Sequence, residues 1–129
     1  MILSERLIQD FILDHARSPR NYGKLDNAII YEANNPGCND SLLIYFKEEK
    51  GKLIFSFEAS GCILSKACAS ILIDEINQRT LEEIKICSHD FLINKLNSKI
   101  IYSRPKCTML ALNIVKTIVK EIESKSVNM

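Results

Sequence analysis

The amino-acid sequence predicts an α+β fold, in which a three-stranded antiparallel sheet is covered on one face by helices. The first observation is a pair of segments, 41–48 and 52–59, that are rich in Leu, Ile, Phe and Tyr. The second is that helical patterns fill most of the chain after these segments, while one further helical pattern precedes the strands. Strands that are grouped together and followed mainly by helices are typical of an α+β domain.

The first predicted element is an N-terminal amphipathic helix over residues 3–17. Its apolar residues recur at helical spacing, and Ser4 is available as a cap. Pro19 and Gly23 belong to a turn-like stretch that ends this helix. Residues 28–33 follow and are expected to form the first strand.

The second and third strands are predicted to form a hairpin. Residues 48–51, with the sequence Glu-Glu-Lys-Gly, can turn the chain between segments 41–48 and 52–59. The period-2 alternation of a strand is clearest at Leu53, Phe55 and Phe57. A hairpin is therefore the simplest interpretation of this region.

Two helices are predicted directly after the hairpin. Gly61 ends the third strand, and an apolar stripe over residues 62 to about 78 predicts a helix that packs on the sheet. Thr80 and Glu83 have the spacing of a capping box, in which each side chain satisfies a backbone N–H group of the other. A short helix is therefore expected to run to about Cys87.

The C-terminal part of the chain is predicted to be helical as well. Ser88 can cap a helix over residues 89–96. Pro105 suits the first turn of a long final helix, because its missing N–H group costs nothing there. The last residues, 124–129, are expected to fray.

Length and composition restrict the class of protein. The 129 residues, 47% of them hydrophobic and 26% charged, suffice for one domain with a real core, so residues 1–129 are expected to form a single domain. The net charge is +1 and no run of five like charges occurs, so nucleic acid and membrane surfaces have no support as partners. No apolar run reaches membrane-spanning length.

The cysteine count indicates reduced thiols. The chain has five cysteines, which is an odd number, and Ser4, Glu5 and Arg6 interrupt the apolar N-terminal residues, so no signal peptide is expected. We therefore expect a cytoplasmic protein, whose thiols serve metal or sulfur chemistry rather than disulfides.

One set of residues suggests a metal or cluster site. Cys38 and Asp40 lie two residues apart in a loop, Cys62 lies where a strand gives way to a helix, and Cys107 lies at the start of the last helix. Three thiolates and one carboxylate suit zinc or an iron-sulfur cluster. The N–H groups of the two helix ends would stabilise thiolates at Cys62 and Cys107. From spacing alone, however, the four residues could also be unrelated core or surface residues.

Sulfur could reach such a site as a persulfide, because an exposed thiolate of low pKa attacks a sulfur–sulfur bond. Cys107 and Cys38 are the candidate acceptors. Arg104, Lys106 and Lys66 could offset the negative charge of the site and hold anionic sulfur, although each is also an ordinary surface residue.

The other cysteines and the histidines are expected to be structural. Cys68 falls on the apolar stripe of its helix and, like Cys87, is interpreted as a small buried hydrophobic residue. His15 lies at helical spacing from Phe11 and is interpreted as a structural histidine, with a partner-binding role as the alternative. His89 follows a helix cap and is expected to be exposed.

Four stretches together form a specific combination. They are Asp14-His15-Ala16-Arg17-Ser18-Pro19-Arg20-Asn21, Gly37-Cys38-Asn39-Asp40, Ser60-Gly61-Cys62 and Lys106-Cys107-Thr108-Met109-Leu110-Ala111. With them the chain resembles, along nearly its whole length, the IscU/NifU/SufU family of iron-sulfur cluster assembly scaffolds. The resemblance implies that Cys38, Asp40, Cys62 and Cys107 bind zinc or a nascent cluster, such as a transient 2Fe-2S cluster. It also implies that a cysteine desulfurase, which is a PLP enzyme, donates sulfur.

Two departures from the family pattern bear on function. Asn39 stands where the family usually has glycine, and asparagine tolerates the left-handed conformation well, so we expect the loop to keep its shape. Lys106 stands where IscU-type members have histidine, as in SufU-type members, yet the segment that SufU-type members insert between the second and third cysteines is missing. Without the histidine, Asp40 becomes the expected fourth ligand.

Three functions are open on these grounds. The first is a scaffold, not an enzyme, that takes sulfur from a desulfurase and iron from an iron donor. It would build a labile cluster, because the oxygen ligand is easily displaced, and pass the cluster to acceptor apo-proteins or carrier proteins. The second is a SufU-type zinc-dependent persulfide carrier, which would be a sulfurtransferase. The third is a structural zinc domain without cargo.

Overall fold

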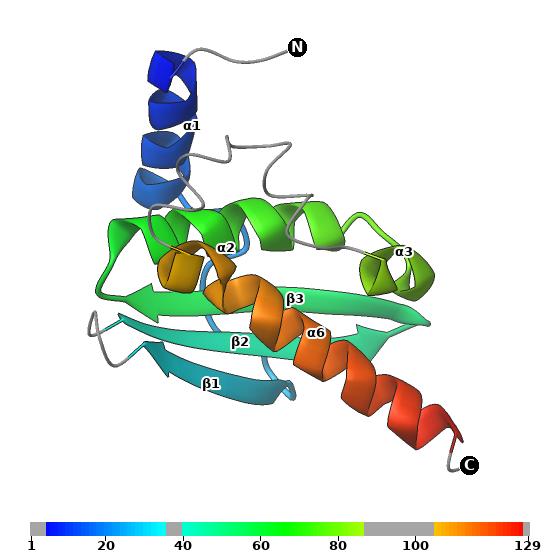
Figure 1. Ribbon diagram of the computed structural model, residues 1–129. Coiled ribbons are helices and arrows are strands. Elements are labelled where there is room, and N and C mark those ends of the chain that lie inside the picture. Colours follow the sequence, from blue (N-terminus) through cyan, green and yellow to red (C-terminus); the bar gives the residue numbers. More distant parts are fainter. Residues whose placement is uncertain (1–4, 36–39, 87–104, 128–129) are drawn as a thin grey trace.

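The computed structural model describes residues 5–35, 40–86 and 105–127 of the chain. Its elements in chain order are α1 (Glu5–Arg17), β1 (Ile29–Asn35), β2 (Asp40–Glu49), β3 (Lys52–Ser60), α2 (Ile63–Ile76), α3 (Leu81–Lys85) and α6 (Pro105–Val127) (Figure 1). The predicted α+β class is confirmed, with its N-terminal helix and its long C-terminal helix.

The three strands form one antiparallel sheet in the order β1-β2-β3. Lys50 and Gly51 connect β2 to β3 with φ angles of 55° and 79°, and positive φ at both central residues is the mark of a two-residue hairpin turn that matches the strand twist. The predicted hairpin is therefore confirmed. The register pairs Ser41 with Ser60, so β2 begins where β3 ends.

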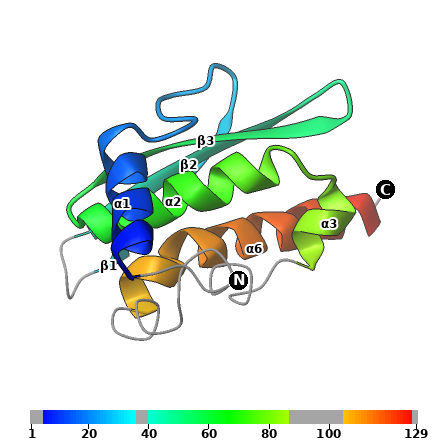
Figure 2. The same cartoon turned by 90° about the horizontal axis from the view of Figure 1, so that it is seen from above.

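Helices α2 and α6 cover one face of the sheet, as the sequence predicts (Figures 1 and 2). Alternate residues of β2 and β3, such as Ile44 and Phe57, point into the core and are fully buried. Leu72 of α2 and Ile118 of α6 are fully buried opposite them. Helix α1 packs against α2, and this contact brings α1 near the N-terminal end of α2 (Figure 2).

The helix ends agree with local sequence signals where the structure describes them. Thr80 and Glu83 form both bonds of the predicted capping box, and α3 ends at Lys85. Helix α6 begins at Pro105 and continues to Val127, through part of the predicted frayed tail. The helix predicted over residues 89–96 lies outside the described residues.

Helix α6 is 23 residues long but carries many charged side chains. Neither α6 nor any other helix in the described parts of the chain combines the length and the apolar character needed to cross a membrane.

The imidazole of His15 ties three segments together inside the protein. His15 is 4% exposed, and its Nδ1 atom lies 2.7 Å from the Ser70 hydroxyl on α2. That hydroxyl also accepts the backbone N–H group of Arg20 at 2.8 Å, and the Phe11 ring packs edge-on against the imidazole. The structural interpretation of His15 is confirmed, because the side chain joins α1, α2 and the turn after α1.

This histidine is expected to make the protein less stable as the pH falls from about 7 to about 5. Burial and, second, the Arg20 guanidinium lower the pKa of His15 below its ordinary value of 6.5, while Asp14 and Asp74 oppose the shift. The unfolded chain therefore binds the proton first. The contribution of neutral His15 to stability is complete above the pKa that His15 has in the unfolded chain. It is lost as the pH falls through the lower pKa that His15 has in the folded protein.

Urea unfolding in the presence of EDTA at pH 7.5 and pH 5.5 would measure this loss, and His15→Gln should flatten it. The carboxylates of Asp14 and Glu83 have pKa values below their ordinary 3.8 and 4.5. They therefore titrate below the range from pH 7.5 to pH 5.5 that is compared. Equal pH dependence of the parent and the variant would contradict the assignment.

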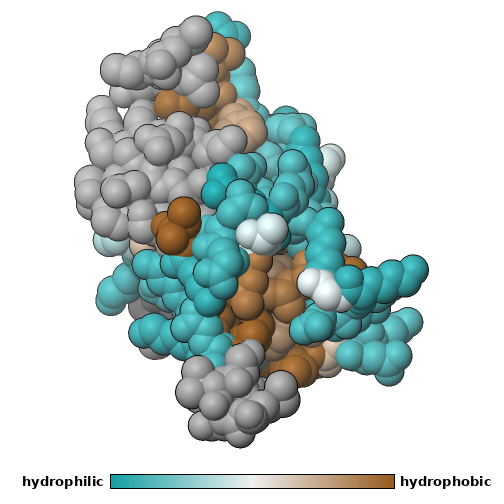
Figure 3. All heavy atoms as spheres, turned by 90° about the vertical axis from the view of Figure 1, so that its right-hand side faces the viewer, coloured by the Kyte–Doolittle hydropathy of each residue, from teal (hydrophilic) through white to brown (hydrophobic). Residues whose placement is uncertain are grey.

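Figure 3 shows the end of the molecule that faces away from the start of β2. Apolar atoms reach the surface there between hydrophilic side chains. Ile29 and Ile30 at the start of β1 are 50% and 55% exposed, and Ile86 after α3 is 80% exposed. Because Asp40 pairs with the last residue of β1, the length of the sheet separates Ile29 and Ile30 from Asp40.

Candidate metal centre

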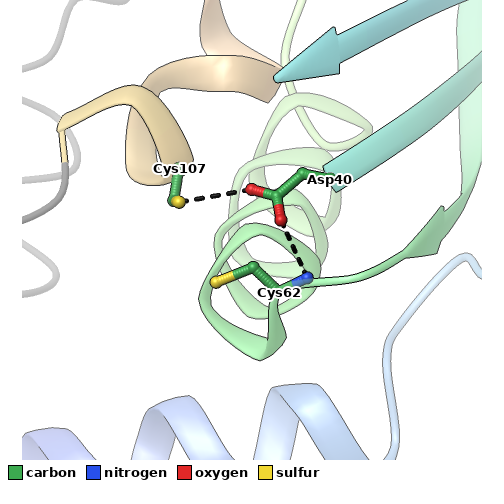
Figure 4. A group of neighbouring side chains, drawn as sticks. All are labelled: Asp40, Cys62 and Cys107. Atoms are coloured by element: carbon green, nitrogen blue, oxygen red, sulfur yellow. Dashed lines mark hydrogen bonds between the residues drawn. The ribbon is translucent and has the colours of Figure 1, made fainter. Parts of the chain in front are cut away.

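Three of the predicted ligands meet at one end of the sheet. Asp40 is the first residue of β2, Cys62 directly precedes α2, and Cys107 is the third residue of α6. One ligand atom from each residue lies within 4.8 Å of the other two. Figure 4 shows the Asp40 carboxylate between the two cysteines. The fold therefore gathers residues that are 67 positions apart in the chain.

The Asp40 carboxylate is buried, with 2% of the residue exposed. Its Oδ1 atom accepts the backbone N–H group of Cys62 at 2.9 Å. Its Oδ2 atom accepts the Ser65 hydroxyl at 2.8 Å and the Cys107 thiol at 3.2 Å. Such bonds compensate a carboxylate for the loss of water, so Asp40 is held in one orientation.

Cys62 stands at the N-terminus of α2, where a backbone turn is required. Gly61 has a φ angle of 99°, which glycine adopts without strain, and it turns the chain from β3 into α2. The Cys62 side chain makes no capping hydrogen bond to α2. The Asp40 carboxylate provides an acceptor at this helix end instead, so one side chain serves both the helix and the candidate site.

Cys107 is a buried thiol in this structure, with 2% of the residue exposed. Burial raises its pKa, and the hydrogen bond to the Asp40 carboxylate raises the pKa further, while a bond with Ser65 acts in the opposite direction. The thiolate stabilisation expected from the start of α6 is thus opposed in the metal-free protein by burial and by Asp40, which raise the pKa of Cys107. Desolvation is the largest influence on this pKa, and a metal would have to displace the thiol proton.

A hollow of about 330 Å³ opens beside Cys62, which is half-buried. It lies between α1, the end of β3 and the start of α2, and two cations, Arg17 and Lys66, line it. The Lys66 ammonium group lies 5.1 Å from the centre of the Tyr22 ring. Lys66 and Cys62 thus line the same hollow, while the charge-offsetting role of Lys66 stays a prediction.

The structure describes some of the remaining predicted residues. Lys106 is exposed at the start of α6, next to Cys107. Cys68 is 1% exposed within the core, and burial raises its pKa to about 12, which confirms its structural interpretation. The remaining predicted residues lie outside the described parts of the chain; they are Cys38, Cys87, His89 and Arg104.

The donor set fits a borderline or soft metal. Thiolate sulfur and carboxylate oxygen are ligands of zinc, and thiolates hold iron-sulfur clusters. Ligands of one tetrahedral zinc ion lie about 3.3–3.8 Å apart, so the spread of at most 4.8 Å among Asp40, Cys62 and Cys107 requires small side-chain movements. Three ligands leave a fourth position, for which Cys38 is predicted.

Ser65 is a residue of this centre that the sequence did not reveal. It is 3% exposed, and its hydroxyl bonds the Asp40 carboxylate across 25 positions of sequence. A serine three residues after a cysteine has no motif of its own. The one signal in the sequence was the spacing of three residues, which places Ser65 on the same side of the helix as Cys62.

Comparison with known proteins shows which family the chain belongs to. A family model described as the NifU-like N terminal domain matches residues 7–129. The chain is also similar to the solved structure of a candidate iron-sulfur cluster assembly scaffold protein for the SUF system of Fervidobacterium islandicum AW-1. That similarity has a TM-score of 0.69 at 25% identity and covers 88% of this chain and 98% of the other.

Two curated relatives have different functional names. The chain is 39% identical over 80 residues to the iron-sulfur cluster assembly scaffold protein IscU of Thermotoga maritima, which covers 60% of this chain and 56% of that protein. It is 34% identical over 80 residues to the zinc-dependent sulfurtransferase SufU of Bacillus subtilis, which covers 60% and 54%. The chain thus spans about half the length of these relatives.

Proposed function

Since the chain belongs to the NifU-like N-terminal domain family, we propose that it is a scaffold on which an iron-sulfur cluster is assembled. The cluster is the cargo, and a transient 2Fe-2S cluster is the form we propose. The ligands would be Cys38, Asp40, Cys62 and Cys107. The observation that supports this most directly is the convergence of the three described ligands from β2, α2 and α6.

The ligand set suits cargo that is bound and then released. Two of the three described ligands are soft thiols, whereas Asp40 offers oxygen, a harder and weaker partner for cluster iron. The Asp40 carboxylate already has hydrogen-bond donors on both oxygens, so it keeps its place when it gives up a metal. A ligand that is stable without metal lowers the cost of release.

Sulfur would enter as a persulfide from a cysteine desulfurase. The scaffold thiolate attacks the terminal sulfur, and the thiolate of the donor leaves as the sulfur–sulfur bond of the donor breaks. Cys107 and Cys38 remain the candidate acceptors, and Cys107 must first give up its S–H bond to Asp40. We add Cys62 as a third candidate, because it is half-buried and lines the hollow that Arg17 and Lys66 also line.

A second function, a zinc-dependent sulfurtransferase, is supported by the similarity to SufU of Bacillus subtilis. In that case zinc would occupy the same ligands at rest, and one cysteine would leave the zinc to accept persulfide. Both functions use a cysteine desulfurase as partner. The scaffold also needs an iron donor and an acceptor apo-protein, whereas the carrier needs neither for its own step.

Anaerobic reconstitution with ferrous iron, L-cysteine, a purified cysteine desulfurase and a thiol reductant, which supplies the two electrons that convert each persulfide sulfur to sulfide, separates these functions. The scaffold is expected to develop stable sulfur-to-iron absorption in the visible range and to pass the cluster to apo-ferredoxin. The carrier is expected to stay colourless, retain zinc and accelerate the desulfurase. A protein that does neither and unfolds when zinc is chelated would contradict both proposals and indicate a structural zinc domain.

A further inference from the structure

Ser65 lies where it can control the carboxylate of the candidate metal centre. It is the third residue of α2, is 3% exposed, and donates its hydroxyl to Asp40 Oδ2 at 2.8 Å. Oδ2 is also the oxygen that accepts the Cys107 thiol. The Cys62 N–H group donates to the other oxygen, Oδ1. The two bonds together fix the rotation of the carboxylate group about the Cβ–Cγ bond of Asp40.

The two donors to Oδ2 differ when a metal binds. A cysteine ligand must lose its proton, so the Cys107 thiol can no longer donate to Asp40 once it coordinates. The serine hydroxyl does not ionise and keeps its proton. The Ser65 hydroxyl can therefore still donate to Asp40 in the metal-bound state, where the orientation of Asp40 matters most.

From this geometry we propose that Ser65 is a positioning residue of the metal centre, whose hydroxyl holds Asp40 in the orientation that lets its carboxylate serve as a ligand. The inference rests on the proposed function, because it requires Asp40 to contact the metal. Hydrogen bonds to metal-ligating carboxylates orient the ligand, and their loss typically lowers metal affinity by about 10-fold to 100-fold.

A double-mutant cycle with Zn²⁺ as the probe tests this role. Ser65→Ala should weaken Zn²⁺ binding by about 10-fold to 100-fold in a competition titration against a chromophoric chelator. In the Asp40→Ala background the same change should have less than about threefold effect, because the carboxylate that Ser65 orients is gone. Ser65→Thr, which keeps the hydroxyl, should restore most of the affinity.

The matched control is Ser56→Ala, which removes another buried serine hydroxyl, one that donates to the Gly23 carbonyl. It should leave the Zn²⁺ affinity within about threefold of the parent. Co²⁺ gives a second readout, since Ser65→Ala should alter the ligand-field bands while the thiolate-to-cobalt absorption remains. Melting of the metal-free variants shows which of them fold.

The outcomes distinguish this inference from the function on which it rests. Equal losses from Ser65→Ala in both backgrounds, or no loss in the parent background, would overturn the role of Ser65 alone. Should Ser65→Thr fail to fold, the alanine cycle still decides. A parent protein that binds neither Zn²⁺ nor Co²⁺ would overturn the proposed metal centre together with the role of Ser65.

Discussion

Replacing Cys62 or Cys107 by alanine is expected to lower the affinity for Zn²⁺ by more than about 100-fold. This loss exceeds the one expected for a residue that orients a ligand without binding the metal itself. The same changes should abolish the visible absorption after reconstitution with iron and sulfide. Each removes one of the three described ligand atoms that lie within 4.8 Å of one another. Chelator competition for Zn²⁺ and absorption spectroscopy for the cluster would measure the losses.

Cys68→Ala is the matched control for these variants. It removes a thiol from α2, the helix that follows Cys62, but this thiol is buried in the apolar core. Loss of the sulfur leaves a small cavity and costs about 1 kcal/mol of stability, while metal affinity should stay at the parent value. If Cys68→Ala lost metal as strongly as Cys62→Ala and Cys107→Ala, the assignment of ligands would be wrong.

Asp40→Ala is expected to lower the free energy of unfolding of the metal-free protein by about 2–4 kcal/mol. The carboxylate accepts the Cys62 N–H group, the Ser65 hydroxyl and the Cys107 thiol, and all three donors would lose this buried acceptor. Urea unfolding in the presence of EDTA would measure the effect without any contribution from bound metal.

The control is Asp10→Ala, which removes an exposed carboxylate from α1. Its effect should stay within about 0.5 kcal/mol. Asp40→Asn adds a further comparison, because the amide oxygen can still accept the Cys62 N–H group while its NH₂ group cannot accept from Ser65. An Asp40→Ala variant as stable as the parent would show that the carboxylate is not needed at the start of α2.

Local sequence signals predicted most of the fold. The Lys50-Gly51 turn, the Thr80–Glu83 capping box and Pro105 at the start of α6 each depend on neighbouring residues, and the structure has each of them in the predicted role. Such signals are readable because their physical causes act within a few residues.

The details of the site depended on distant contacts and could not be read in the same way. The Ser65 bond to Asp40 and the Cys107 bond to Asp40 join residues 25 and 67 positions apart. The raised pKa of Cys107 follows from burial, whereas the sequence indicated the opposing influence of the helix end. Desolvation depends on the whole fold, so residue type and spacing alone do not reveal it.

The order in which the proposed ligands occur along the chain decides when the proposed centre can be completed during synthesis. Asp40 and Cys62 are translated before Cys107, which belongs to α6, the last helix that the structure describes. A partly translated chain therefore lacks a ligand until α6 emerges, and chains fold progressively from the N-terminus as they are made. Under the proposed function, truncated products that stop before α6 would lack the Cys107 ligand, so the centre is complete only in chains translated through that helix.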